Sequence, residues 1–248
     1  MKYKQLFFYW SVFVLLVNVH FIYSQNVIKP KELYKPTQDE VVDAEYGIII
    51  YNKLVPCMGG DSIRYNKVGY NAQSWQEDYY NSGKLLHRGF YIDGQIKVFK
   101  NYWENGNLER ELIAVDNLRC KLITYYPNGQ PRSEVTYYEG SEIKQKDYFE
   151  NGSVELDEEI DKKDGHIIKR IINYPNSKPK ILMELTDKKL KIYSYKEFYE
   201  NGNIKEEGTL NFRKDMNDYV KNGEWKLYDE SGKLIKSVNY VNNEEQKN

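Results

Sequence analysis

The sequence predicts an all-β protein: an elongated single antiparallel sheet (a meander) of about seven tandem β-hairpins. Three observations lead to this fold class. A turn sequence recurs every 23 to 29 residues, polar and apolar residues alternate between the turns, and 24 of the 248 residues are tyrosine. A recurring period indicates stacked repeats, and alternation with period two indicates strands with one covered and one solvated face. Aromatic residues favour strands and are scarce in disordered chains.

The first series of turns follows an aromatic residue in each repeat. The aromatic positions are Tyr80, Trp103, Tyr126, Phe149, Tyr174, Tyr199 and Tyr228. The turn glycines are Gly83, Gly106, Gly129, Gly152, Gly202 and Gly232, and Ser177 replaces glycine in the fifth copy. Asn-Gly tolerates positive φ at both residues, so we predict two-residue type I′ turns. Pro131 and Pro179 follow two of these turns and must lie at a strand start or an edge, where no ladder donor is needed.

A second series of turns falls between the members of the first. Its sequences are Asp93-Gly94, Asp116-Asn117, Glu139-Gly140, Asp164-Gly165 and Asp187-Lys188. Two turns per repeat predict two strands per repeat, each of about 6–8 residues, and therefore about fourteen strands. The right-handed twist of strands should coil this sheet.

Residues 1–24 are predicted to be a signal peptide. Lys2 and Lys4 precede 18 uncharged residues, which end at Tyr23 before the small residue Ser24. A basic start, an apolar stretch and a small-residue exit are typical of an export signal. The alternative is an uncleaved N-terminal membrane anchor, but 18 residues is short for a membrane span. We therefore expect an exported protein that is periplasmic, on the cell surface or secreted.

The remaining chain divides by composition and period. Open repeat arrays need a covered end, and the residues before the first repeat carry a predicted strand over 45–55 that could supply it. The last connection is lengthened by an insertion at 211–221. The predicted segments are an exposed leader at 25–40, an N-terminal cap at 41–75, the repeat array at 76–241 and a flexible tail at 242–248.

Two segments carry a family resemblance. Gly223-Glu224-Trp225-Lys226-Leu227-Tyr228 and the eleven residues from Phe198 to Gly208 resemble the MORN-repeat variant (membrane occupation and recognition nexus) family. The resemblance covers about Tyr65 to Tyr240 and implies a hairpin-repeat fold. Bacterial proteins of this kind are often labelled the antitoxin component of a YwqJK-type toxin–antitoxin module. The resemblance therefore implies two possible functions, toxin binding and association with phospholipids.

The cysteines raise two questions. Cys57 and Cys120 are the only cysteines, and an exported chain meets an oxidising compartment, so they can form a disulfide. Whether they pair is open, because they lie far apart in the sequence. A catalytic Cys57 would need a base, and only His87 and His166 follow the predicted signal peptide. We therefore expect no catalytic residues and no enzyme.

Charged residues give little support for a metal, a cofactor or a nucleic acid. A calcium loop needs oxygen ligands at fixed spacing around a glycine. The acidic run lacks that spacing and is better explained as a solvated strand face; its members are Glu155, Asp157, Glu158, Glu159, Asp161 and Asp164. Two histidines without paired spacing disfavour zinc. The formal net charge of -1 disfavours nucleic-acid binding, which requires a basic surface.

The aromatic residues are the candidate binding residues. These are the seven that precede the turns, together with Trp225; their neighbours, such as Tyr79, Tyr102, Tyr125, Tyr148 and Phe198, point to the opposite face of a regular strand. One layer cannot bury both rows, so one row is left as a recognition surface. We predict a non-enzymatic extracytoplasmic scaffold for a protein or a glycan. The alternatives are an antitoxin or immunity component that binds a cognate toxin, and a phospholipid-associating protein, although the mature chain lacks a basic amphipathic stretch.

Overall fold

The computed structural model describes residues 42–43, 47–48, 54–55, 59–60, 63–66 and 68–246. The predicted signal peptide and leader lie outside these residues. The chain forms two compact units, one of residues 1–35 and 65–70 and the other of residues 36–64 and 71–248. In the first unit, a tight turn is closed by the N–H of Asn66, which donates to the carbonyl of Tyr70 at 2.7 Å.

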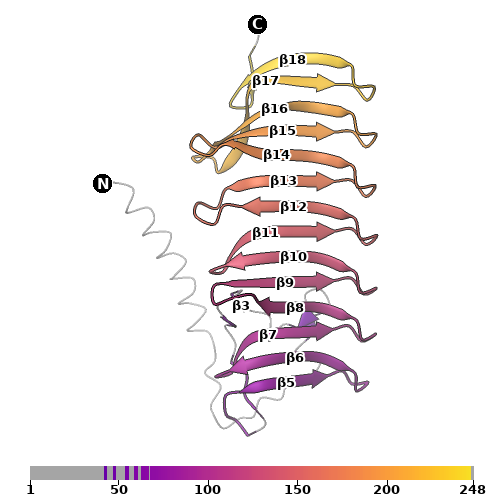
Figure 1. Ribbon diagram of the computed structural model, residues 1–248, viewed down its shortest axis with the longest axis vertical. Coiled ribbons are helices and arrows are strands. Elements are labelled where there is room, and N and C mark those ends of the chain that lie inside the picture. The colour runs from indigo at the N-terminus through magenta and orange to yellow at the C-terminus, as the bar shows by residue number, and fades with distance from the viewer. Residues whose placement is uncertain are drawn as a thin grey trace, which may run out of the picture. The chain divides into compact units, whose positions relative to one another are not determined.

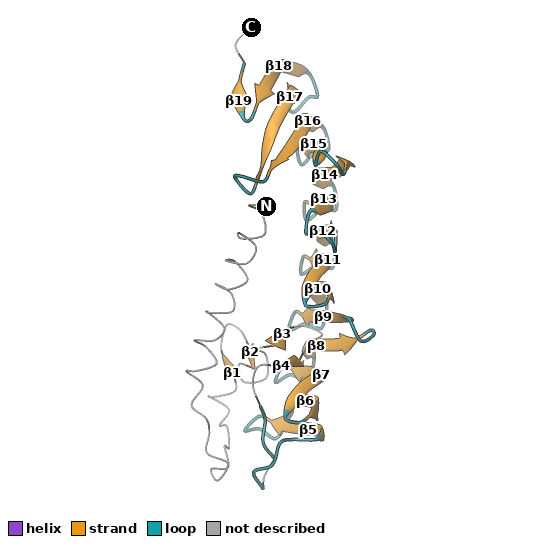
Figure 2. Cartoon of the chain, turned by 90° about the vertical axis from the view of Figure 1, so that its left-hand side faces the viewer, coloured by secondary structure: helices purple, strands orange, loops and turns teal. Residues whose placement is uncertain are grey.

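The second unit contains one open antiparallel sheet of 15 strands, arranged in sequence order (Figure 1). Seen edge-on, the strands form a single layer (Figure 2). This confirms the predicted meander. The strands are β5 (Ser74–Tyr79), β6 (Leu85–Ile92), β7 (Gln95–Tyr102), β8 (Leu108–Ala114), β9 (Arg119–Tyr125), β10 (Pro131–Tyr138), β11 (Ser141–Tyr148), β12 (Val154–Ile160), β13 (Ile167–Asn173), β14 (Pro179–Asp187), β15 (Ile192–Phe198), β16 (Ile204–Arg213), β17 (Asp218–Tyr228), β18 (Leu234–Val241) and β19 (Glu244–Glu245).

Proline lies where the ladder does not need its missing donor. Pro131 and Pro179 are the first residues of β10 and β14, which confirms their prediction as strand starts.

Near the C-terminus, the meander continues where a flexible tail was predicted. Asn242 and Asn243 both have positive φ, and β19 then pairs with β18.

Four short strands precede the array. β1 (Val42–Asp43) pairs with β2 (Gly47–Ile48), and β3 (Leu54–Val55) pairs with β4 (Gly59–Gly60). The prediction of one strand over 45–55 is therefore wrong, because its two ends belong to separate two-stranded sheets. β4 contacts β7 of the large sheet. The role of residues 41–75 as a cap stays a prediction.

The turns of the first series differ from the predicted type. The N–H of Trp103 donates to the carbonyl of Asn107, and the N–H of Gly106 donates to that of Trp103, both at 2.8 Å. Three residues thus form the loop, and of these only Gly106 has positive φ, at 93°. The predicted two-residue type I′ turn is wrong. The physical reason is that the Asn105 side chain accepts the N–H of Asn107 at 2.9 Å, which stabilises a local turn and leaves positive φ to glycine alone.

Type I′ geometry occurs in the second series instead. Asp93 and Gly94 have φ values of 51° and 78°, and Glu139 and Gly140 have φ values of 49° and 80°. A two-residue turn with positive φ at both positions is the tight connection that suits twisted antiparallel strands.

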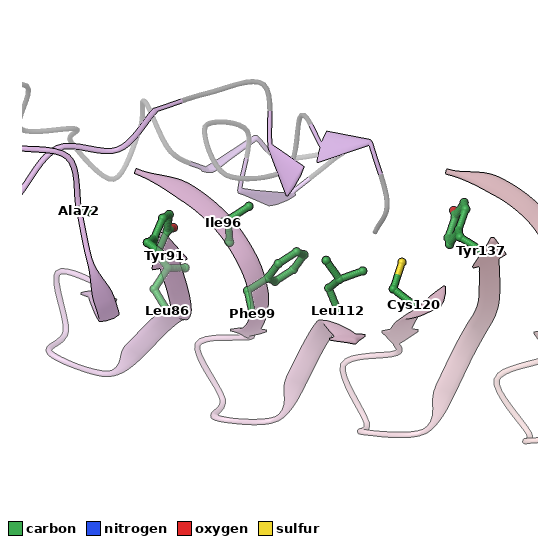
Figure 3. Packing of buried hydrophobic residues seen from close by; sticks show 8 residues of the cluster. All are labelled: Ala72, Leu86, Tyr91, Ile96, Phe99, Leu112, Cys120 and Tyr137. Atoms are coloured by element: carbon green, nitrogen blue, oxygen red, sulfur yellow. The ribbon is translucent and has the colours of Figure 1, made fainter. Parts of the chain in front are cut away.

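The sheet has an inner face, which we define by the cross-strand series Phe99, Leu112, Leu122, Val135. A first buried cluster lies on this face and consists of Ala72, Leu86, Tyr91, Ile96, Phe99, Leu112, Cys120 and Tyr137. Figure 3 shows the members of this cluster that lie in β6 to β10 projecting to the same side of the sheet, whereas Ala72 precedes β5. A second buried cluster consists of Ile167, Met183, Tyr193, Leu210 and Trp225. Cross-strand pairs place Met183 on the inner face as well.

The second cluster is closed by a long hairpin. The insertion at 211–221 extends β16 and β17 instead of making a loop, and both strands bend away from the line of the middle strands (Figure 2). The Phe212 ring lies 4.6 Å from the His166 ring, and the Tyr219 ring lies 5.1 Å from the Tyr193 ring, measured between centroids. The hairpin therefore covers the inner face beside it, at the second cluster, and its bend is that of a strongly twisted two-stranded ribbon.

Candidate functional site

The inner face turns polar between its two buried clusters. Gln145, Glu158 and Arg170 pair in succession across β11, β12 and β13, in a register that carries Val135 before them and Met183 after them. These five positions belong to one cross-strand series, so three consecutive strands interrupt an otherwise apolar row. We call Ser133, Gln145, Asp147, Glu158 and Arg170 the central polar stretch.

Hydrogen bonds fix the side chains of this stretch. Ser133 Oγ donates to Asp147 Oδ1 at 2.6 Å, and Gln145 Nε2 donates to Asp147 Oδ2 at 2.7 Å. Arg170 and Glu158 form an ion pair in which Glu158 is only 8% exposed. Within the described part of the chain, no lysine or arginine forms an ion pair with Asp147. Its carboxylate is thus oriented by two neutral donors and keeps acceptor capacity for a further donor.

A hollow of about 460 Å³ lies at this place on the sheet. Its lining includes Thr124, Tyr126, Arg132, Ser133, Asp147 and Glu155. Arg132 and Glu155 are exposed, each is the second residue of its strand, and neither has an ion pair with another described residue. They occupy equivalent positions one repeat apart, which is two strand spacings or roughly 10 Å. The hollow therefore carries one free positive and one free negative side chain beside a fixed carboxylate.

The predicted binding aromatics link successive repeats. The hydroxyl of Tyr80 donates to the carbonyl of Tyr102 at 2.7 Å, that of Tyr126 to the carbonyl of Tyr148 at 2.7 Å, and that of Tyr174 to the carbonyl of Phe198 at 2.8 Å. The hydroxyl of Tyr199 reaches the carbonyl of Tyr228 in the same way at 2.9 Å. Trp103 and Phe149 hold the same register without a hydroxyl, and Trp225 is fully buried. These bonds give the tyrosines a structural role, and ligand binding by this row as a whole stays a prediction.

Asparagine side chains form a second link along the same edge. Asn105 and Asn107 both donate through Nδ2 to the carbonyl of Pro127 at 2.8 Å. Asn201 and Asn203 repeat this arrangement on the carbonyl of Glu230 at 2.7 Å. In these repeats, and at Asn151 with the Pro175 carbonyl, a turn thus satisfies a carbonyl of the next turn, which helps to hold neighbouring repeats in register.

The opposite, outer face carries ion pairs between neighbouring strands. Lys100 lies 3.0 Å from Glu111, and Lys121 pairs with Glu134. The neighbouring tyrosine row lies here: the hydroxyl of Tyr125 donates to Glu111 at 2.6 Å and that of Tyr148 to Glu134 at 2.8 Å. Burial alone would raise the pKa of Glu134, but the hydrogen bonds from Lys121 and Tyr148 outweigh it and lower that pKa. Tyr125 and Tyr148 of this row thus donate hydrogen bonds to carboxylates that also form ion pairs between strands.

Five of the six acidic residues in the run each form an ion pair with a different basic residue. Its ion pairs are Asp157 with Lys169, Glu158 with Arg170, Glu159 with Lys144, Asp161 with Lys188 and Asp164 with Lys191. The hydrogen bond from Lys188 lowers the pKa of Asp161 well below its ordinary value. Among the described residues, no three His, Cys, Asp or Glu side chains are grouped closely enough to hold a metal ion. Each acid of the run except Glu155 serves an ion pair between strands or turns.

The histidines and cysteines take structural positions. His87 is fully buried, with Nδ1 2.7 Å from Asn101 Oδ1 and Nε2 2.9 Å from the Tyr91 hydroxyl. Burial lowers the pKa of His87 to about 4, against a smaller opposing effect of the Asn101 hydrogen bond. Cys120 is disulfide-bonded. Cys57, the other cysteine of the sequence, lies outside the described residues.

The chain is thus a β-repeat scaffold: an open single-layer sheet of hairpins in which side-chain hydrogen bonds link successive repeats. Four segments, residues 95–113, 121–137, 194–211 and 221–242, match the family described as MORN repeat variant. This confirms the resemblance for the repeats themselves and carries no information on a toxin or a lipid. No curated protein matches the chain.

A solved structure of an S. aureus TarM mutant, in complex with fondaparinux, alpha-GlcNAc-glycerol and UDP, is similar at 8% sequence identity and a TM-score of 0.27. The similarity covers 60% of this chain and 21% of that one. A TM-score of this size supports no argument about fold or function. In the described residues no helix is long and apolar enough to cross a membrane.

Sequence reasoning missed the hollow. It singled out Tyr126 and noted Glu155, but not Arg132, Ser133 or Asp147. The available signal was the loss of apolar residues at the inner-face position of three successive strands. That signal can be recognised only when the strand register is known, because a one-residue shift moves every side chain to the other face.

Proposed function

We propose that this protein is a non-enzymatic extracytoplasmic scaffold that holds a partner molecule on the central polar stretch of its inner face. The observation that supports this proposal is the interruption of the apolar inner row by Gln145, Glu158 and Arg170 between two buried clusters. The side chains of the two clusters are buried against one another. The polar stretch between the clusters instead presents hydrogen-bonded polar side chains and a hollow.

The proposal of a binding role in place of catalysis rests on the state of the reactive groups. A nucleophile needs a base within hydrogen-bonding reach. His87 is buried and hydrogen-bonded on both ring nitrogens, and His166 packs against Phe212. Cys120 is held in a disulfide and has no free thiol.

The proposal of an extracytoplasmic location rests on two features. Residues 1–24 have the composition of an export signal. The disulfide at Cys120 suits an oxidising compartment, because thiols are kept reduced in the cytosol.

Affinity capture with two matched variants tests the binding face. The full chain is immobilised, exposed to a cell-envelope extract, and the retained proteins and glycans are identified. Gln145→Leu changes the inner face and Lys146→Leu changes the outer face at the next residue, so the two variants differ mainly in the side of the sheet they alter.

We expect a partner that the original chain and Lys146→Leu retain and that Gln145→Leu loses. Retention of no partner at any salt concentration would contradict the scaffold proposal. Equal retention by both variants would show that the inner face is not the binding face.

A further inference from the structure

We propose that the hollow between β9 and β12 binds one sugar unit of a glycan. This inference rests on the proposed function and names the class of partner for the same face. It is carried by Asp147, the free side chains of Arg132 and Glu155, and Tyr126, all of which line the hollow.

Asp147 is the fixed point of the site. Its two oxygens are held by Ser133 and Gln145 at 2.6 and 2.7 Å, so the carboxylate is oriented before any ligand arrives. Each carboxylate oxygen can accept a second hydrogen bond, and a hydroxyl that donates to a carboxylate forms a short, strong one. A ligand with hydroxyl groups therefore gains a bond here without displacing an existing partner.

The rest of the lining offers both donors and acceptors. The Arg132 guanidinium can only donate, the Glu155 carboxylate can only accept, and the hydroxyls of Thr124 and Ser133 can do both. Sugar hydroxyls also donate and accept, so one sugar ring can satisfy both kinds of group at once. An anion such as phosphate would meet two carboxylates, Asp147 and Glu155, against one arginine, which disfavours it.

A zwitterionic peptide is the competing ligand, since Arg132 and Glu155 carry opposite charges. Both side chains are exposed, however, and exposed ion pairs contribute little free energy. The groups that the fold holds most firmly are the hydrogen-bonding ones around Asp147. The arrangement therefore favours recognition of hydroxyl groups over recognition of separated charges.

Tyr126 supplies an apolar surface beside these polar groups. Its ring is held in place because its hydroxyl donates to the Tyr148 carbonyl at 2.7 Å. A fixed aromatic ring presents an electron-rich face against which C–H groups of a sugar ring can pack. The volume of about 460 Å³ lies at the lower end of ligand pockets, which suits one unit of a chain whose neighbours extend into solvent.

The test uses the full chain and a panel of soluble oligosaccharides built from glucose, galactose, mannose and N-acetylglucosamine, with a zwitterionic tripeptide as the competing probe. Binding is measured by titration calorimetry and by saturation-transfer NMR. Asp147→Asn removes the charge with almost no change of shape. Asp157→Asn is the matched control, because Asp157 lies on the outer face of the adjoining strand, where it pairs with Lys169.

We expect at least one oligosaccharide to bind with a Kd on the order of 0.1–1 mM. Asp147→Asn should weaken this binding about tenfold or more, whereas Asp157→Asn should change it less than about twofold. Circular dichroism melts check that both variants stay folded.

Three results would overturn the inference: no oligosaccharide binding at concentrations on the order of 10 mM, equal affinity in the two variants, or binding of the tripeptide in preference to sugars. If envelope capture still yields an inner-face partner after such a result, the scaffold proposal stands and only the glycan assignment fails.

Discussion

At the scale of single residues, Ser177 marks a place where one repeat departs from the others. It stands where its sister turns carry glycine and has a φ of 66°. This left-handed conformation costs an L-residue about 1–2 kcal/mol, and glycine adopts it without a steric penalty. The turn hydrogen bond from the Ser177 N–H to the Tyr174 carbonyl does not involve the serine side chain.

Ser177→Gly should therefore stabilise the protein by about 0.5–1 kcal/mol, after the extra flexibility of glycine in the unfolded chain is subtracted. The free energy of unfolding is measured by denaturant titration. Ser231→Gly is the control and should destabilise, because it removes the hydroxyl that donates to Asp229 Oδ1 at 2.6 Å and adds flexibility to the unfolded chain. Stabilisation by Ser231→Gly as well would contradict this account of the turn.

His87 is the residue whose charge state should matter most for stability. Its pKa is lowered from 6.5 to about 4 in the folded chain by burial, while Asp78 and Arg64 act on it with smaller, opposing effects. The unfolded chain takes up the proton near pH 6.5, and the folded chain does so only near pH 4. The contribution of neutral His87 to the free energy of unfolding is thus complete above pH 6.5 and declines as the pH falls toward 4.

We expect this decline to reach about 3 kcal/mol at pH 4, because the pKa of His87 is 6.5 in the unfolded chain and about 4 in the folded chain. The measurement is the free energy of unfolding between pH 7 and pH 4, compared with His87→Gln, in which the slope should be smaller. Other titrating groups affect both proteins alike, so the difference reports on His87. Identical slopes would contradict the claim that His87 is buried in its neutral form.

At the scale of strands, Gly208 of β16 packs directly against the indole ring of Trp225 in β17. A Cβ added at Gly208 would lie 2.4 Å from the Trp225 indole, and Trp225 is fully buried. The indole also donates through Nε1 to the Thr209 carbonyl at 3.1 Å. Gly208→Ala should destabilise by about 1–3 kcal/mol, because the ring has no room to move.

A double-mutant cycle checks the cause of this loss. In a Trp225→Leu background the added methyl has space, so Gly208→Ala should cost clearly less than in the original chain. The free energies of unfolding of the four proteins give the comparison. An equal cost in both backgrounds would mean that the backbone at Gly208, and not the ring, sets the penalty.

The tyrosine links between repeats give a second prediction for the strands. Tyr126→Phe keeps the ring and removes the bond to the Tyr148 carbonyl, which should cost about 1 kcal/mol. Tyr79→Phe is the matched control, because Tyr79 is 54% exposed and its hydroxyl bonds to the exposed Glu77, so it should cost little. Thermal and denaturant unfolding of both variants provide the test, and a cost at Tyr79 equal to that at Tyr126 would argue against the links.

At the scale of the whole array, the sequence is sufficient for the meander but not for its details. The turn period predicts hairpins that pair in order, and Pro131 and Pro179 mark strand starts, because these features depend only on local patterns. The turn type failed because the Asn side chains form hydrogen bonds with the backbone. The polar stretch was missed because it appears only when Gln145, Glu158 and Arg170 are aligned across strands.

The same limit applies to the insertion at 211–221. Its length predicts a longer connection, but Phe212 and Tyr219 make it a hairpin that packs on Tyr193 and His166. Its packing partners come from β15 and from the residue just before β13, and they cannot be inferred from the insertion alone. Packing against distant residues, and not the polarity of the insertion itself, thus determines that residues 211–221 form a hairpin.

The central claim is that the inner face is covered at its two clusters and open at the polar stretch between them. Alkylation of single introduced cysteines tests it most directly, at Gln145→Cys in the polar stretch and at Met183→Cys in the second cluster, where Met183 is 4% exposed. The natural Cys120 is held in a disulfide and should not react. We expect rapid alkylation at position 145 and strong protection at position 183 in the folded protein. Equal protection at both positions would show that the middle of the inner face is covered, and would contradict the account.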